Sequence, residues 1–325
     1  MSGLDAASAF ALLGRSGRVR RWHEAGKRFR ANRAAAWSAA VFLGLVIFCA
    51  VWPALSPYGP NEIHLYDQLQ RPSPAHPLGT DFFGRDLLTR MAVGGTNSLL
   101  IVGLALGFIL VLGISYGAAA GLSGGKVDSV LMRFLDGLFA LPRFPIMVSI
   151  LVVVGFRNSM YTVVLALAVM GWMTTARFVR AEIVELKTSD YVKAAHAIGA
   201  RWHQTLARHL IPNMSGVLIV VVFLEIPALI LGEALVSAIG LGVNIPTATW
   251  GTIAQDGLTV NLGSGTYGYD YREGLSIPYP YVVIVPSVAV GILAVTANFI
   301  ADGLHDALDP RRGHGGALEA KPPQI

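Results

Sequence analysis

Residues 190–213 read D-Y-V-K-A-A-H-A-I-G-A-R-W-H-Q-T-L-A-R-H-L-I-P-N, a polar stretch with helical character between two apolar segments. Asp190 can cap a short helix, and Gly199 can end that helix in a left-handed turn. A second helical run, 201–210, is expected to stop before Pro212, because the residue before a proline avoids the helical conformation. Two short helices at a glycine corner suit either a docking device or an ordinary surface hairpin between membrane spans. The spacing leaves both interpretations open.

The composition is that of a membrane protein. Of the 325 residues, 54% are hydrophobic and 14% are charged, whereas a soluble domain carries about 25% charged residues. The lone cysteine, Cys49, lies in an apolar run, which excludes a disulfide framework and a cysteine-based metal site. The first apolar run begins near Ala34, after a basic stretch, and is too long for the core of a secretory signal. We therefore expect it to remain as a membrane anchor.

Six apolar segments predict an all-α integral membrane protein with six transmembrane helices. They cover 34–55, 96–122, 144–155, 161–176, 214–238 and 281–301. We divide the chain into a basic N-terminal segment (1–33), a first transmembrane helix (34–55), a loop (56–95), a five-helix core (96–301) and a C-terminal tail (302–325). The core contains two further loops, 177–213 and 239–279. Its first part holds an expected interfacial helix, 129–142, before a short, proline-bent third span.

The second span carries Gly113, Gly117 and Gly121, four residues apart on one helical face. Small residues in this register allow two helix backbones to approach closely. The pattern predicts that this face packs against another helix.

The distribution of basic residues predicts the orientation. The side that holds both termini, 123–143 and 177–213 carries 20 of the 25 Lys and Arg residues, and the opposite side carries five. Because basic loops stay in the cytoplasm, the termini and the 190–213 hairpin are expected there. The loops 56–95 and 239–279 are then extracytoplasmic, and the basic segment 1–33 is a flank on anionic lipid rather than a nucleic-acid site.

The sequence shows no catalytic pattern. Gly125-Lys126 could end a nucleotide-binding P-loop, but Ala120 stands where that loop needs Gly and Val127 where it needs Ser or Thr. His196, His203 and His209 suit a polar helix face better than a metal site, so no metal is expected.

Glu225 and Glu233 lie in the fifth span, where a carboxylate is costly and usually faces a cavity or another helix. Either could belong to a translocation pathway, although Glu233 could also lie at the outer membrane interface, exposed to water. Two non-enzyme classes follow. One is a stand-alone ion-coupled secondary transporter that uses Glu225 and Glu233. The other is a membrane subunit that takes energy from a cytoplasmic partner.

The hairpin resembles the cytoplasmic loop of the permease subunits of ATP-binding cassette importers. That loop reads E-A-A, three residues, Gly, nine residues, then an apolar residue, any residue, an apolar residue and Pro. The matching positions are Ala194, Ala195, Gly199, Ile211 and Pro212, while Lys193 replaces the Glu and His209 replaces an apolar residue. A basic residue at the first position is familiar in the peptide branch of the family.

Three further segments resemble the second permease subunit of dipeptide, oligopeptide and nickel importers. They are H-P-L-G-T-D-F-F-G-R-D-L-L-T-R (76–90), E-A-L-V-S-A-I-G-L-G-V-N-I-P-T-A-T-W-G (233–251) and D-G-L-H-D-A-L-D-P-R (302–311). The loop 259–277 looks longer and more aromatic than this branch usually carries, which leaves the substrate and the binding-protein contact open.

The resemblance implies a type I importer permease in the cell membrane of a bacterium or archaeon. Its partners would be a homologous permease, two cytoplasmic ATPase subunits or domains, and an extracytoplasmic substrate-binding protein. ATP and Mg would be bound by the ATPases, so no cofactor is expected on this chain. Residues 191–198 would form the coupling helix. The implied ATPase-coupling residues are Tyr191, Lys193, Ala194, Ala195, Ile198, Gly199, Arg201 and Pro212.

Overall fold

The structure is a computed structural model, and it describes residues 22–154, 159–197, 199, 202–206, 210–244, 246–262 and 279–308. For 191, 195–197 and 202–203 it describes the backbone alone. A helix covers 22–31. The elements that follow are α2 (Arg33–Leu55), η1 (Leu65–Asp67), α3 (Leu87–Ser123), α4 (Gly125–Phe139), α5 (Arg143–Val154), α6 (Met160–Lys187), α7 (Asp190–Ala197), α8 (Trp202–Thr205), α9 (Ile211–Ala238), α10 (Trp250–Leu262) and α11 (Tyr281–Leu308).

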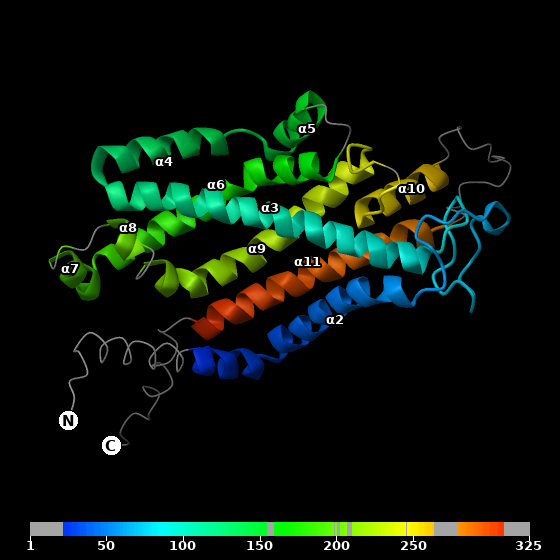
Figure 1. Ribbon diagram of the computed structural model, residues 1–325, viewed down its shortest axis with the longest axis horizontal. Coiled ribbons are helices and arrows are strands. Elements are labelled where there is room, and N and C mark those ends of the chain that lie inside the picture. The colour runs from blue at the N-terminus through cyan, green and yellow to red at the C-terminus, as the bar shows by residue number, and fades with distance from the viewer. Residues whose placement is uncertain are drawn as a thin grey trace, which may run out of the picture.

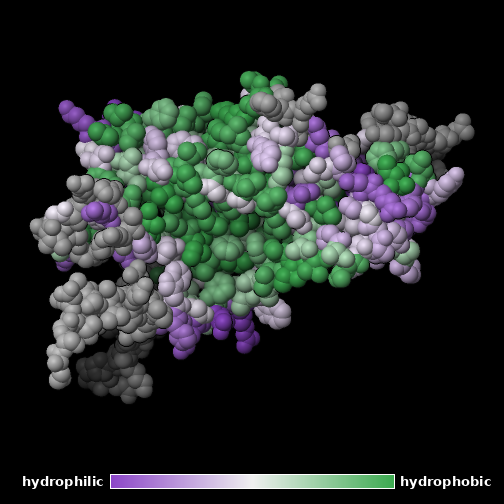
Figure 2. Space-filling model, viewed as in Figure 1, coloured by the Kyte–Doolittle hydropathy of each residue, from purple (hydrophilic) through white to green (hydrophobic). Residues whose placement is uncertain are grey.

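The long helices run side by side along one axis, with α2 and α11 on one side of the bundle and α4 and α5 on the other (Figure 1). We call the end with 22–31, α7 and the last turn of α11 the terminal end. The end with residues 56–86 and α10 is the loop end. Hydrophobic residues cover the middle of the bundle and hydrophilic residues gather toward both ends (Figure 2). This distribution is what a lipid bilayer around the middle requires.

Five helices within the described ranges, namely α2, α3, α6, α9 and α11, are long and apolar enough to cross a membrane. Three of them begin at a polar side chain that accepts a hydrogen bond from the backbone N–H three residues on. These caps are Asn32 for α2, Asp86 for α3 and Ser159 for α6. The caps satisfy N–H groups that would otherwise be unpaired at the start of a helix.

The sixth crossing is formed only if a bent pair counts as one span. Helices α4 and α5 pass the same test only together, and they meet at an angle of 83°. Their bounds are close to those predicted for the helix at 129–142 and for the short, proline-bent third span at 144–155. Twelve residues of α5 reach only about 18 Å, too short for a hydrocarbon core of about 30 Å. Helix α4 lies along α3, where Tyr116 Oη donates to the Leu131 carbonyl at 2.7 Å.

The predicted packing of the glycine face of α3 is confirmed. A Cβ atom at Gly113 would lie 2.6 Å from Thr175 of α6, and one at Gly117 would lie 2.5 Å from the Ala176 carbonyl oxygen. Gly121 meets α6 in the same way. Helices α3 and α6 are therefore in close contact at three positions over about two turns, a separation at which an added Cβ atom would force a neighbour to shift.

The main core lies between α3, α6, α9 and α11. Its buried residues include Ile101, Ile109, Leu167, Ile230 and Leu293. A second, smaller core lies at the terminal end, where α7 meets the bundle.

Candidate functional site

The hairpin at the terminal end contains the turn that the sequence predicted. Helix α7 has eight residues, and Gly199 follows it with a φ of +88°. This left-handed conformation is strained for any residue with a Cβ atom. Gly199 is exposed, so the corner projects from the bundle.

The start of α7 differs from the prediction. Asp190 is not the capping residue but the first residue of the helix. The Ser189 carbonyl accepts from the N–H groups of Val192 at 3.2 Å and Lys193 at 3.1 Å, so the chain has already turned at Ser189, two residues after α6 ends. The Asp190 carboxylate then lies near the positive end of the helix dipole, where a negative charge is favourable.

One side of α7 is anchored in the bundle and the other is exposed. Val192 is fully buried in the small core, which also contains Val179 of α6 and Met214 of α9. Lys193 and Ala194 are exposed, and the Lys193 Nζ lies 3.8 Å from Asp190, a surface ion pair of little energetic value. Helix α7 therefore presents a free face while being tied to α3, α6 and α9 through Val192.

Helix α8 covers Trp202–Thr205, and part of the predicted helical run 201–210, including 207–209, lies outside the described residues. Pro212 lies in the first turn of α9, which begins at Ile211. A proline lacks the N–H that would be unpaired there anyway, so it suits the beginning of a helix as well as the end of one. The remaining predicted coupling positions, Ile198, Arg201 and the side chains of Tyr191 and Ala195, lie outside the described residues.

The two glutamates of α9 have different surroundings. Glu233 is completely buried and accepts hydrogen bonds from Ser98 Oγ at 3.2 Å and Ser237 Oγ at 2.9 Å. It is therefore not a wet interfacial residue. Ser98 in turn accepts from the Trp250 backbone N–H at 3.1 Å, so Glu233 joins α3, α9 and α10.

Glu225 is 7% exposed and lies midway along α9. Its Oε2 atom lies against Gly171 of α6. A Cβ atom added to Gly171 would be 4.0 Å from this oxygen. The structure therefore does not bring the two glutamates together as a pair.

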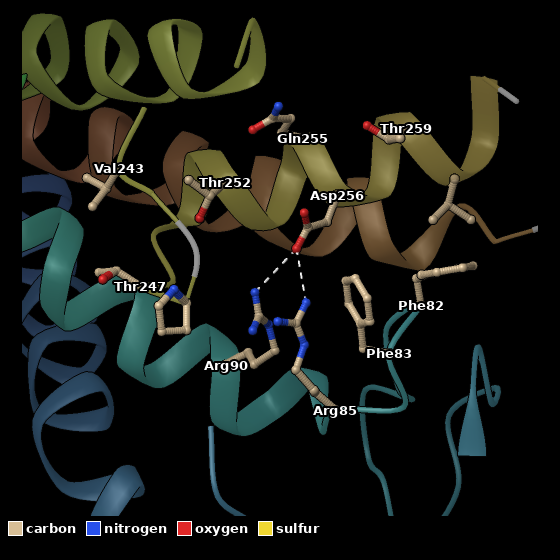
Figure 3. A pocket seen from close by; sticks show the side chains of 12 residues that line it. Phe82, Phe83, Arg85, Arg90, Val243, Thr247, Thr252, Gln255, Asp256 and Thr259 are labelled. Carbon is tan, nitrogen blue, oxygen red and sulfur yellow. Dashed lines mark hydrogen bonds and ion pairs between the residues drawn. The ribbon is translucent and has the colours of Figure 1, made fainter. Parts of the chain in front are cut away.

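A cluster of four charges at the loop end was missed by the sequence analysis. Asp81 Oδ2 lies 2.6 Å from Arg85 Nε and 3.2 Å from Arg90 Nε. Asp256 of α10 bridges the same two arginines, at 3.2 Å from Arg85 Nη2 and 3.3 Å from Arg90 Nη2 (Figure 3). Asp81, Arg85 and Arg90 are nearly inaccessible to solvent, while the Asp256 side chain keeps 27% of its surface exposed.

This cluster borders a cavity of about 280 Å³ between the N-terminal end of α3 and α10. Its wall also contains aromatic, apolar, hydroxyl and amide side chains, among them Phe82, Phe83, Val243, Thr252 and Gln255 (Figure 3). Burial raises the pKa of Asp256, and the guanidinium groups of Arg90 and Arg85 oppose part of that rise. Of the four charged side chains, Asp256 keeps the largest exposed fraction and is the one most open to a molecule that enters from the loop end.

A second set of contacts fastens α10 to α3. Trp250 Nε1 donates to the Met91 carbonyl at 2.9 Å, and Asn97 Nδ2 donates to the Ala248 carbonyl at 2.7 Å. The motifs 76–90 and 233–251 were each recognisable in the sequence, but the contact between 233–251 and the residues directly after 76–90 was not. The contacting residues are more than 150 residues apart, a spacing that no local pattern reveals.

Comparison with known proteins supports this architecture. Residues 109–314 match the family described as binding-protein-dependent transport system inner membrane component, and residues 20–72 match the N-terminal TM domain of oligopeptide transport permease C. The chain is 33% identical over 290 residues to the oligopeptide transport system permease protein OppC of Bacillus subtilis, which covers 89% of this chain and 90% of that protein. It is also 33% identical to the dipeptide transport system permease protein DppC of the same organism, over 89% of this chain and 85% of that one.

The OppC protein of Escherichia coli K12 is 36% identical over 89% of this chain and 91% of its own length. Among solved structures, the inward-facing methionine ABC transporter MetNI aligns with a TM-score of 0.51 and 20% identity. That alignment covers 66% of this chain and 94% of the other, and it shows a shared fold.

Proposed function

Because this chain belongs to the family of binding-protein-dependent transport system inner membrane components, we propose that it forms half of the pathway of an ATP-driven importer of di- or oligopeptides. The peptide class is supported by the relatives, which are named as oligopeptide and dipeptide transport permeases. The alternative of a stand-alone ion-coupled transporter gains no support, since Glu233 is enclosed by hydroxyl donors and the relatives are permeases of binding-protein-dependent systems.

The observation that carries the proposal is the geometry of α7. It is a short helix with an exposed face, closed by a left-handed glycine and held to the bundle by Val192. Such a helix can seat in the groove of another protein and pass on a displacement without bending. We assign α7 as the element that docks a cytoplasmic ATPase, with Lys193 and Ala194 on the contact face.

The proposed assembly contains a second, homologous permease, two ATPase subunits or domains that bind ATP and Mg, and an extracytoplasmic binding protein. The terminal end would face the cytoplasm, because 20 of the 25 Lys and Arg residues belong to the segments predicted on that side. The loop end, with its charged cavity beside α10, would face the binding protein.

The test is a substitution on the exposed face of α7. Ala194→Trp should leave the chain folded but abolish co-purification of the ATPase subunits and peptide uptake, because the large side chain prevents close docking. Ala31→Trp is the matched control, since Ala31 is also exposed at the terminal end but lies outside the hairpin. Normal ATPase binding and uptake by the Ala194→Trp complex would refute the docking role.

A further inference from the structure

The exposed guanidinium of Arg143 lies in the middle of the bundle rather than at either end. Its Nη2 donates to Thr174 Oγ1 of α6 at 3.0 Å, and the pair is open to the outside of this chain. The count of basic residues had assigned 123–143 to the cytoplasmic side. Helix α4 instead runs along α3 away from the terminal end (Figure 1), and Arg143, the first residue of α5, follows the 83° bend and contacts Thr174.

The depth of Arg143 follows from the neighbouring helices. Glu225 is the fifteenth of the 28 residues of α9, and it faces Gly171 of α6. Thr174 is three residues beyond Gly171, which is about 4.5 Å along the helix axis. The Arg143 guanidinium is therefore within about one helical turn of the middle of the span.

More polar groups share this side of the chain. Arg177 Nη2 lies 2.5 Å from Asp136 Oδ1, with side chains 46% and 63% exposed, and its guanidinium stacks 3.9 Å above the Phe139 ring. We call the surface formed by Asp136, Arg143, Thr174 and Arg177 the polar face.

Apolar side chains are exposed on both sides of the bundle. Along α2 and α11 they include Leu43, Ile47 and Val288, and on the side of Arg143 they include Phe134, Leu141 and Phe144. These side chains are suited to lipid, whereas an exposed guanidinium at mid-depth is costly in hydrocarbon and is found facing a water-filled cavity or another protein.

We propose that the polar face is this chain's wall of the translocation pathway, and that Arg143 binds the carboxylate of the passing solute. The proposal rests on the proposed peptide-importer function and deepens it. A guanidinium offers five donors in a plane and pairs with a carboxylate through two parallel hydrogen bonds. Thr174 occupies only one donor of Arg143, so the remaining donors face the pathway.

The polar face gives the Arg143 guanidinium access to water, while α5 itself offers it no acidic partner. Water in the pathway hydrates the guanidinium between transport events, and the solute carboxylate replaces that water during passage. The Asp136–Arg177 pair lies closer to the terminal end, where the two charges neutralise each other.

The first test measures water access in the assembled, membrane-embedded complex and does not require a known substrate. Cys49 is buried, so single thiols introduced elsewhere can be labelled selectively. Arg143→Cys should react with a charged, membrane-impermeant thiol reagent about a hundredfold faster than Leu43→Cys, because the reagent and the thiolate both need water. Leu43 is the matched control, being exposed and midway along α2. Equally slow labelling of both thiols would show that the polar face contacts lipid and would overturn the proposal.

The second test measures recognition, with uptake of one peptide carrying a free C-terminal carboxylate and of the same peptide with a C-terminal amide. Arg143→Ala should reduce uptake of the carboxylate form about tenfold more than uptake of the amide, whereas Arg133→Ala on the exposed side of α4 should reduce neither. Equal losses for both peptides would overturn carboxylate recognition. If the unaltered complex transports no peptide while Arg143→Cys is still labelled rapidly, the peptide assignment fails and the pathway assignment stands.

Discussion

Asp256 of α10 lies 3.3 Å from Arg90 of α3, although 166 residues separate the two in the sequence. The same carboxylate reaches Arg85 at 3.2 Å. One acidic side chain thus holds the segment after α9 against the beginning of α3. Because both arginines are almost fully buried, they depend on their acidic partners for compensation of charge.

Asp256→Asn should therefore destabilise the protein by about 2–3 kcal/mol. This is a small loss of stability for a broken buried ion pair, because Asp81 still pairs with both arginines and Asp256 is partly exposed. Thermal unfolding in detergent, followed by the near-UV signal of the Trp residues, measures the change. Glu62→Gln is the control, since its partner His64 is exposed and the loss should stay below about 0.5 kcal/mol. Equal stability of the two variants would contradict a stabilising cluster.

Gly117→Ala should destabilise the contact between α3 and α6 by about 1–3 kcal/mol, because the added Cβ atom would lie 2.5 Å from the Ala176 carbonyl oxygen. Gly103→Ala on the same helix meets no atom within 4 Å and should be neutral or slightly stabilising, as alanine favours the helix. The comparison requires only the unfolding temperatures of the two variants. A destabilisation of similar size at Gly103 would point to helix flexibility rather than packing.

Glu233→Leu should lower stability by about 1–3 kcal/mol, since the hydroxyls of Ser98 and Ser237 would lose their buried acceptor. Glu233→Gln retains an acceptor oxygen and should preserve both folding and peptide uptake. Uptake by reconstituted complexes, corrected for the amount of assembled protein, separates the two variants. Loss of uptake in a stable Glu233→Gln complex would instead assign a transport role to the carboxylate.

Val192→Ala should weaken the connection between α7 and the bundle without removing the exposed face of α7. Val192 is fully buried in the core shared with Val179 and Met214, so truncation leaves a cavity beneath the helix. We expect ATP hydrolysis to continue while the number of peptides transported per ATP falls. Val184→Ala, at an exposed position of α6, should leave this ratio unchanged. An unchanged ratio in Val192→Ala would show that α7 is not the coupling element.

The features predicted correctly from the sequence are those that depend on nearby residues. Apolar runs identify the spans because hydropathy acts on each segment separately, and the left-handed turn at Gly199 follows from the lack of a Cβ atom. The glycine face of α3 was predicted for the same reason, since its three members recur on one helix.

Three features could not be predicted from the sequence. Two depend on tertiary structure, and for the third the local sequence is compatible with two conformations. Pro212 suits the end of one helix and the beginning of the next, and packing of Leu210 and Met214 at the start of α9 decides between them. The bend before Arg143 places a basic residue at mid-depth, which no count of charges detects. The contact of Asp256 with Arg90 depends on how α10 folds back on α3.

The 37 residues of α3 connect the two ends of the molecule. Its first turns hold the arginine that pairs with Asp256, and Ala118 near its last turn belongs to the core that holds Val192. Events at the two ends are then linked thermodynamically, and the linkage is reciprocal. If occupancy of the loop-end cavity strengthens the binding of a protein to α7 by some factor, that protein must strengthen occupancy of the cavity by the same factor.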